Sequence, residues 1–157
     1  MDPDIPLTSS AFSHLDVAVL IPCLNEERTV TTVIAGFRAA LPTAAIYVYD
    51  NNSVDRTQDV ALAAGAIVRR MPIPGKGNVV RAMLGDIDAD IYVLVDGDDT
   101  YDAAIAPRIV DMIASDCYDI VQANESGLGL QRLPRRPRLW QPCARPLGPA
   151  SVQGTCS

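Results

Sequence analysis

Short apolar segments alternate with helical segments over residues 16–121, and this alternation constrains the fold more than any other feature of the chain. The first segment, residues 16–22, is a continuous apolar run typical of a strand buried on both faces. We expect a helix after it, with Asn25 as its N-cap and Pro42 at its end. Strands linked by helical crossovers lie parallel in one sheet. The sequence therefore predicts an α/β fold with a mostly parallel sheet flanked by helices.

The same alternation predicts the later elements. The expected strands are residues 45–49, 66–70 and 91–95, with a further strand near 119–121. One expected helix ends at residue 64 and is followed by Gly65 as its C-terminal glycine. Two further helices are expected over residues 79–84 and 105–113. Ligands bind beyond the carboxyl ends of the strands in such sheets. Polar residues that follow strand ends are therefore the first candidates for a site.

Charge and proline content divide the chain into three parts, which we expect to be a polar leader (1–15), a folded domain (16–127) and a tail (128–157). The tail holds five arginines, five prolines and no acid, and we predict that it is disordered. An out-of-frame reading of a GC-rich gene would produce such an ending. We therefore interpret the folded domain as truncated.

Composition excludes several classes of function. The formal net charge of -6 disfavours nucleic acid as a partner. The four cysteines show no Cys-x-x-Cys spacing, which favours free thiols over a zinc site or a disulfide framework. No apolar run is long enough to span a membrane, and the N-terminus lacks a signal-peptide pattern. We expect a cytoplasmic protein.

The most specific motif is Asp96-Gly97-Asp98-Asp99-Thr100, directly after the apolar strand 91–95. Carboxylates two residues apart offer oxygen ligands to Mg2+ or Mn2+, and such a cation can bridge a diphosphate. Asp96 and Asp98 are the predicted metal ligands, and Asp99 is a weaker candidate. The alternative is that these acids only cap the strand end and the next helix.

Three further segments place polar residues after strand ends or at a helix start. Pro22, Asn25 and Glu26 follow the first strand, where they could meet a base or ribose. Asp50 follows the second strand, and Lys76 begins a helix within Gly-Lys-Gly, a position suited to phosphate. Each segment alone also fits an ordinary helix cap or turn.

The four segments in this order resemble the N-terminal half of family 2 glycosyltransferases, over roughly residues 16–123. The resemblance is to the branch that transfers sugars to polyprenyl phosphate. It implies a Rossmann-like GT-A fold, a UDP- or GDP-sugar donor, inversion at the sugar, and a position at the inner face of the membrane. It also implies a role for each candidate: Pro22, Asn25, Glu26 and Asp50 at the base and ribose, Lys76 at the phosphates, Asp96 and Asp98 at the metal-diphosphate, and Thr100 as a further polar ligand.

The resemblance ends after about Val121, where relatives continue into an acceptor-binding region. No acid follows Glu125, so the general base that the wider family often takes from its later half is absent from the sequence that remains. One alternative is a non-catalytic fragment that binds nucleotide. Another is a haloacid-dehalogenase-like phosphatase with Asp96 as nucleophile, although no lysine follows Lys76 to assist it.

Overall fold

The computed structural model describes residues 15–116, 120–123 and 130–132 and shows the predicted parallel α/β sheet. The main sheet has the strand order β3-β2-β1-β4, with every pair parallel. Its strands are β1 (Val17–Cys23), β2 (Ala45–Asp50), β3 (Ile67–Arg70) and β4 (Ile91–Leu94). The helices are α1 (Val30–Ala40), α2 (Thr57–Ala63), α3 (Lys76–Asp86), the 3-10 turn η1 (Ala103–Ile105) and α4 (Ala106–Asp116).

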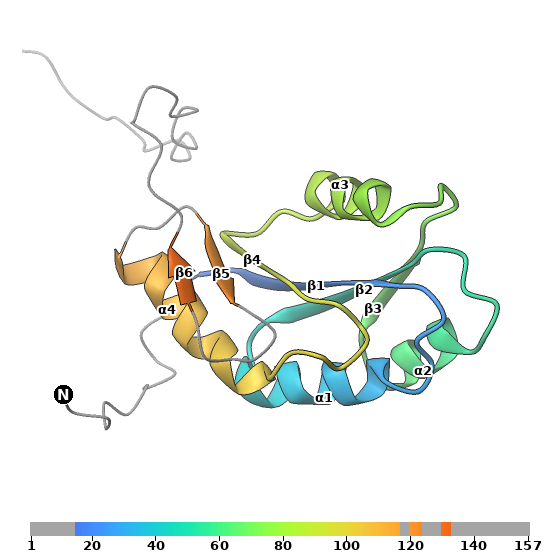
Figure 1. The fold of residues 1–157 in the computed structure, drawn as a ribbon, viewed down its shortest axis with the longest axis horizontal. Helices are drawn as coiled ribbons and strands as arrows, with labels where there is room; N and C mark the ends of the chain where they lie inside the picture. Colours follow the sequence, from blue (N-terminus) through green and yellow to red (C-terminus); the bar gives the residue numbers. More distant parts are fainter. Residues whose placement is uncertain (1–14, 117–119, 124–129, 133–157) are drawn as a thin grey trace, which may run out of the picture.

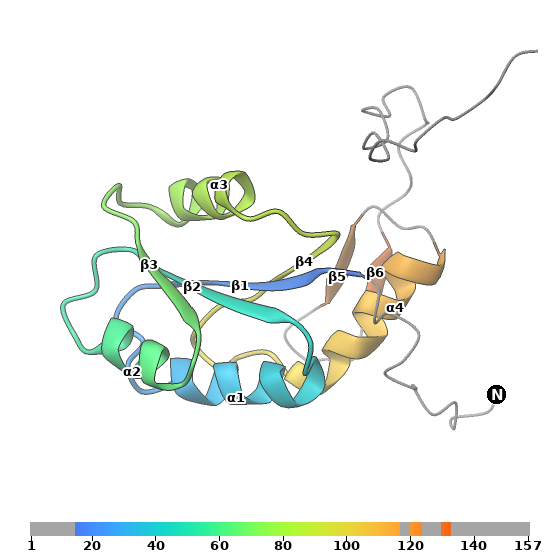
Figure 2. The same cartoon turned by 180° about the vertical axis from the view of Figure 1, so that it is seen from behind.

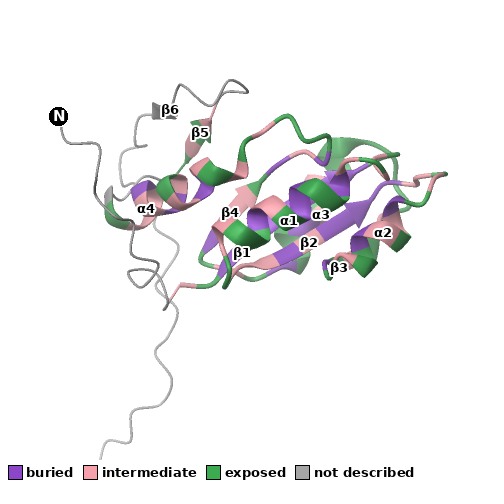
Figure 3. Cartoon of the chain, turned by 90° about the horizontal axis from the view of Figure 1, so that it is seen from below, coloured by how far each residue is buried: buried purple, intermediate pink, exposed green. Residues whose placement is uncertain are grey.

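Helices cover both faces of the sheet. Figures 1 and 2 show α1, α2 and α4 on one face and α3 on the other. β1 lies in the middle, and all seven of its residues are buried, as the coloured view also shows (Figure 3). Its side chains alternate between the two layers: Val19 and Ile21 pack with α1, whereas Ala18 and Leu20 pack with α3. A strand that is covered on both faces must be apolar throughout, which explains its sequence.

The connections create a switch point between β1 and β4. α1 and α2 carry the chain from β1 outward to β2 and then to β3. α3 then returns it across the opposite face to β4, on the other side of β1. The strand order thus reverses between β1 and β4, and ligands in such sheets bind beyond the carboxyl ends of the strands at a point of this kind. The segments that follow both strands, α1 and η1–α4, lie on the same face of the sheet, where η1 packs against α1.

The start of α1 corrects one expectation. The helix begins at Val30 with Thr29 as its N-cap residue, so Asn25 does not cap it. Asn25 instead takes a left-handed backbone conformation with φ 59°, and its Oδ1 accepts a hydrogen bond from the Val54 amide at 2.9 Å. The Asn25 side chain therefore joins the loop after β1 to the loop after β2.

The other boundaries follow the sequence pattern closely. Gly65 lies just beyond α2 with φ 84°, as a C-terminal glycine should. The last predicted strand lies two residues further on, as β5 (Val121–Ala123), and pairs with β6 (Leu130–Arg132) in a small antiparallel sheet. Residues 130–132 of the predicted tail thus lie in a strand, and disorder of the tail stays a prediction. The rest of the tail and residues 1–14 lie outside the described residues.

Cys23 is a free, buried thiol, as predicted, and the other cysteines lie outside the described part of the chain. No helix among the described residues is both long and apolar enough to cross a bilayer.

Candidate functional site

The acidic motif leaves the sheet at the switch point. The Val95 amide donates to the Leu20 carbonyl at 3.0 Å, which extends the pairing of β4 with β1 by one residue. The chain then turns away from the sheet, so that Asp96 and Asp98 follow at the carboxyl edge beside the loop that leaves β1. The structure thus brings the predicted metal ligands to the place where this sheet topology favours ligand binding.

Asp98 is held by its own loop. Its Oδ1 accepts from the Thr100 amide at 3.1 Å and also from the Thr100 hydroxyl. The hydroxyl is the main reason that the pKa of Asp98 lies below its ordinary value. The carboxylate is exposed and therefore ionised near neutral pH. Asp99 has φ 64°, so the backbone turns between Asp98 and Thr100. The result is an oriented, charged oxygen donor facing solvent.

Lys76 reaches the same edge from the first residue of α3. Its ammonium group forms an ion pair with Oδ1 of Asp96. The lysine side chain is 60% exposed and that of Asp96 is 32% exposed, so this pair is accessible to a ligand. A cation at the start of a helix, beside a carboxylate, suits a ligand that brings both phosphate and a metal ion.

Glu26 joins this cluster from the loop after β1. Its Oε2 is buried and has no hydrogen-bond partner among the described residues. Burial raises the pKa of Glu26 above its usual value; a hydrogen bond between the Cys23 thiol and the Glu26 carboxylate lowers it in part, and the charges of Asp98 and Asp96 raise it further. Asp96 and Asp98 therefore lie close enough to Glu26 to disfavour its charged form. A buried oxygen without a partner and a concentration of negative charge both favour a cation.

Gly97 allows this close approach. A Cβ atom at this position would lie 2.1 Å from Oε2 of Glu26 and 2.7 Å from Sγ of Cys23. The Gly97 carbonyl also accepts from the Thr29 hydroxyl at 2.6 Å, which ties the acidic loop to the start of α1. Sequence reasoning missed Gly97 and Thr29 as site residues. The glycine between two acids was the available signal, but its contact with Glu26 is not visible in a local pattern.

Asp50 and Asn25 organise the loop after β2. The Asp50 side chain is fully buried and accepts from the Ser53 amide at 3.2 Å and from Gln58 Nε2 at 2.7 Å. The backbone amide of Asn25 donates to the Ser53 hydroxyl at 2.8 Å. Pro22 is buried within β1. Pro22, Asn25 and Asp50 lie along the same edge as the acidic cluster. Contact between any of them and a nucleotide stays a prediction.

The described residues do not form a closed metal site. No group of three or more His, Cys, Asp or Glu side chains in this part of the chain could hold a metal ion by itself. Carboxylate oxygens of Asp96 and Asp98 are nevertheless suitable ligands for Mg2+ or Mn2+. Mg2+ is commonly held by one or two carboxylates and completed by phosphate oxygens and water. The cluster fits a cation of this kind when a diphosphate arrives with it.

A groove of about 330 Å³ adjoins the acidic cluster. It runs between β4 and the η1–α4 segment and reaches β5, with Lys76 and Asp96 among its lining residues. Its walls are largely apolar, and Ile105, Ile109 and Ile113 form one stripe of α4 and the turn before it. β4 is the edge strand of the described sheet on this side. The groove thus leads away from the cluster along the open side of the fold.

Comparison with known proteins identifies the family that shares this arrangement. A family model described as glycosyl transferase family 2 matches residues 18–149. The chain belongs to glycosyl transferase family 2. Protein RfbJ of Shigella flexneri is 51% identical over 110 residues, which are 70% of this chain and 85% of that protein. Dolichyl-phosphate hexose transferase of Haloferax volcanii is 32% identical over 120 residues, which are 76% of this chain and 52% of that protein.

Solved structures of glucosyl-3-phosphoglycerate synthase from Mycobacterium tuberculosis share the fold. The complex of that enzyme with Mn2+ and UDP-glucose has a TM-score of 0.63 and 27% identity, over 73% of this chain and 45% of that one. Its complex with UDP has a TM-score of 0.60 and 28% identity, over 68% of this chain and 43% of that one. This chain therefore spans less than half of these structures and about half of the Haloferax transferase.

The family resemblance and the GT-A fold predicted from sequence are confirmed. The family match reaches residue 149, so the expected limit near residue 123 was too short. Membership in this family also removes the phosphatase alternative, since the acidic motif follows the fourth strand of a glycosyltransferase domain.

Proposed function

We propose that this chain binds a nucleoside diphospho-sugar together with Mg2+ or Mn2+ at the carboxyl edge of β1, β2 and β4. The observation that carries the proposal is the convergence of Glu26, Asp96 and Asp98 with Lys76 at the switch point. A metal-bridged diphosphate supplies positive charge to the acids and negative charge to the lysine, so both needs are met by one ligand.

Each residue has a distinct part in this proposal. Asp98, already oriented by Thr100, binds the cation, and Asp96 joins it when Lys76 turns from that carboxylate to a phosphate oxygen. The cation, when bound, offsets the charge that develops on the departing diphosphate. Pro22, Asn25, Glu26 and Asp50 line the adjoining part of the edge, where the base and ribose would lie. A similar enzyme has been solved in complex with Mn2+ and UDP-glucose, which supports binding of a divalent cation together with a sugar nucleotide.

The finer proposal concerns the acceptor. A relative named dolichyl-phosphate hexose transferase supports polyprenyl phosphate as the acceptor. With such an acceptor we also propose a peripheral position at the inner face of the membrane. Transfer to a hydroxyl acceptor needs a general base, whereas an acceptor phosphate is already ionised near neutral pH. Asp102 is a carboxylate outside the donor cluster that lines the groove beside Asp96. We infer that the chain binds its donor and that transfer by this chain alone is weak or absent, because the chain spans about half of the Haloferax transferase.

Calorimetric titration of UDP-glucose and GDP-mannose tests donor binding. We expect one of the two to bind in the presence of Mn2+ or Mg2+ and to lose its affinity when EDTA removes the cation. Asp98→Asn and Asp96→Asn should each weaken metal-dependent binding by about tenfold or more. Asp59→Asn is the matched control, because it removes one exposed carboxylate from the start of α2.

The outcomes separate the proposal from its alternatives. Equal loss in Asp98→Asn and Asp59→Asn would show that only overall charge matters and would contradict the assigned site. Binding of neither sugar nucleotide by the folded wild type would overturn the proposal. If the donor binds, incubation with polyprenyl phosphate and a labelled donor measures transfer, and a chain that binds donor without transferring sugar is the non-catalytic alternative.

A further inference from the structure

Asn51, at the first position after β2, is a buried residue whose side-chain amide forms all of its described hydrogen bonds with one loop. The residue is 8% exposed, and its backbone amide donates to the Cys23 carbonyl at 2.8 Å. Its side-chain Nδ2 donates to the carbonyls of Met71 at 3.0 Å and Ile73 at 2.8 Å. Its Oδ1 accepts from the Gly75 amide at 2.8 Å. One side chain thus binds both ends and the middle of the loop 71–75.

The chemistry of the loop requires an amide at this position. Two carbonyls need two N–H donors and one amide N–H needs an acceptor, and a primary amide provides all three. The Gly75 N–H also fixes which side-chain atom is the oxygen. An aspartate would keep the acceptor and lose both donors, with its charge held against two carbonyl oxygens. Loss of these bonds leaves partly buried polar groups of the loop without their partner.

The loop 71–75 leads directly into Lys76, whose ammonium group belongs to the proposed donor site. Gly75 has φ 110°, a conformation suited to glycine, and α3 begins at the next residue with Lys76. Lys76 then reaches Asp96, which lies beyond β4 on the far side of the sheet's central strand. The position of this ammonium group therefore depends on where the loop ends. Asn51 sets that point from the end of β2.

We infer that Asn51 is a positioning residue that holds the loop 71–75 so that Lys76 meets the diphosphate of a bound sugar nucleotide. The inference rests on the proposed function and assigns Asn51 no contact with the ligand. It separates two roles of neighbouring residues: Asp50 organises its own turn through Ser53 and Gln58, whereas Asn51 acts across the sheet edge on α3.

A double-mutant cycle between Asn51 and Lys76 tests the inference in the full chain. Affinity for UDP with Mn2+ is measured for the wild type, Asn51→Ala, Lys76→Met and the double variant. If Asn51 acts through Lys76, Asn51→Ala should weaken UDP binding about tenfold in the wild-type background. In the Lys76→Met background the same change should weaken it by no more than about twofold. Asn51→Asp repeats the cycle with a nearly isosteric side chain, should the alanine variant fold poorly.

Two further measurements complete the design. Asn52→Gly is the matched control, because Asn52 makes one bond to the same loop, to the Pro72 carbonyl at 3.0 Å, and its φ of 67° suits glycine. This control should keep UDP affinity within about twofold of the wild type. Amide hydrogen exchange of Gly75 without ligand should accelerate in Asn51→Ala and Asn51→Asp and stay near the wild-type rate in Asn52→Gly.

Each result decides a different claim. Equal losses of affinity in both Lys76 backgrounds, or unchanged Gly75 exchange in the Asn51 variants, would overturn the positioning role while leaving the donor site intact. Absence of binding of both UDP and GDP by the wild type would overturn the proposed function and the positioning role with it. Coupling between the two positions together with faster Gly75 exchange supports the inference.

Discussion

Glu26 lies with its carboxylate against the backbone of Gly97, although 70 residues of sequence separate the two. The contact joins the loop after β1 to the loop after β4, at the carboxyl edge of the sheet where the donor is proposed to bind. A Cβ at this position would lie 2.1 Å from Oε2 of Glu26 and 2.7 Å from Sγ of Cys23, so any other residue requires these side chains or the loop to move. The stability of the domain and the shape of the site therefore depend on the same glycine.

Gly97→Ala should destabilise the protein. The new methyl group displaces a partly buried carboxylate and the buried Cys23 thiol, and overpacking of this kind costs about 1–3 kcal/mol of unfolding free energy. Urea denaturation measures the change. Gly85→Ala is the control, since a Cβ at Gly85 in α3 meets nothing within 4 Å and should stabilise the helix by about 0.5–1 kcal/mol. A neutral Gly97→Ala would show that the two loops can separate at little cost.

Lys76→Met should affect binding far more than stability. The Lys76–Asp96 ion pair is exposed, and such pairs contribute less than about 1 kcal/mol to unfolding free energy. Removal of a phosphate-binding cation should weaken UDP binding about tenfold. Arg81→Met removes one positive charge from an exposed position on the same helix and should leave UDP binding nearly unchanged. Similar losses in both variants would point to general electrostatic attraction instead of a specific contact.

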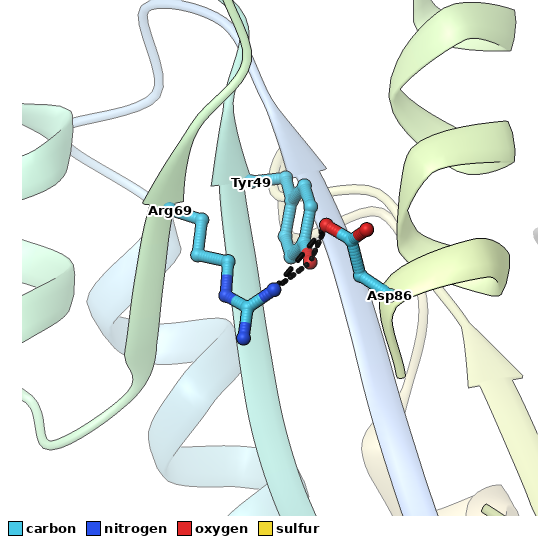
Figure 4. A network of polar contacts seen from close by, with 3 residues as sticks. All are labelled: Tyr49, Arg69 and Asp86. Carbon is cyan, nitrogen blue, oxygen red and sulfur yellow. Dashed lines mark hydrogen bonds and ion pairs between the residues drawn. The ribbon is translucent and has the colours of Figure 1, made fainter. Parts of the chain in front are cut away.

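Tyr49 should give the protein a distinct alkaline response. Its hydroxyl donates to Oδ2 of Asp86 at 3.0 Å and accepts from Nη1 of Arg69 at 3.2 Å (Figure 4). Burial, followed by the hydrogen bond to Asp86, raises the pKa of Tyr49 above its ordinary value of 10.0. Above this pH the unfolded chain loses the tyrosine proton while the folded protein keeps it. The stability that Tyr49 contributes is therefore complete below pH 10 and is lost as pH rises through the folded-state pKa.

Urea denaturation at about pH 9 and about pH 11 checks this response. The unfolding free energy of the wild type should fall more steeply over this range than that of Tyr49→Phe. Tyr47→Phe, which removes a hydroxyl from the same strand, should keep the wild-type slope. Identical slopes for the wild type and Tyr49→Phe would mean that the hydroxyl is not held in its neutral form by folding.

Thr29→Val should weaken the link between α1 and the acidic loop. The substitution keeps the shape of the side chain and removes the hydroxyl that donates to the Gly97 carbonyl at 2.6 Å. We expect a loss of about 1 kcal/mol in unfolding free energy, measured by thermal or urea denaturation. Thr32→Val lies on the exposed side of the same helix and should change stability by less than about 0.5 kcal/mol. A loss no greater than that of Thr32→Val would argue that this bond is replaced by water.

Much of the candidate site was predictable because its residues follow strand ends. The apolar run before Asp96 identified a buried strand, and a parallel sheet gathers the carboxyl ends of its strands at one edge. Asp96, Asp98 and Lys76 do meet at that edge. The role expected for Asn25 as a helix cap was wrong, because capping residues also serve turns and loops, and no local pattern shows which partner will be nearest.

By itself the sequence determined the kind of fold, since the spacing of apolar residues depends only on whether a segment is a strand or a helix and how many of its faces are covered. It also determined the acidic motif and the family. Only the tertiary structure decided which strands are neighbours, with β4 beside β1, and hence that Glu26 packs on Gly97 and that Asn51 holds the loop before Lys76. The physical reason is that a buried hydrogen bond or close contact is satisfied by whichever groups the packing brings together, and those groups lie far apart in the chain.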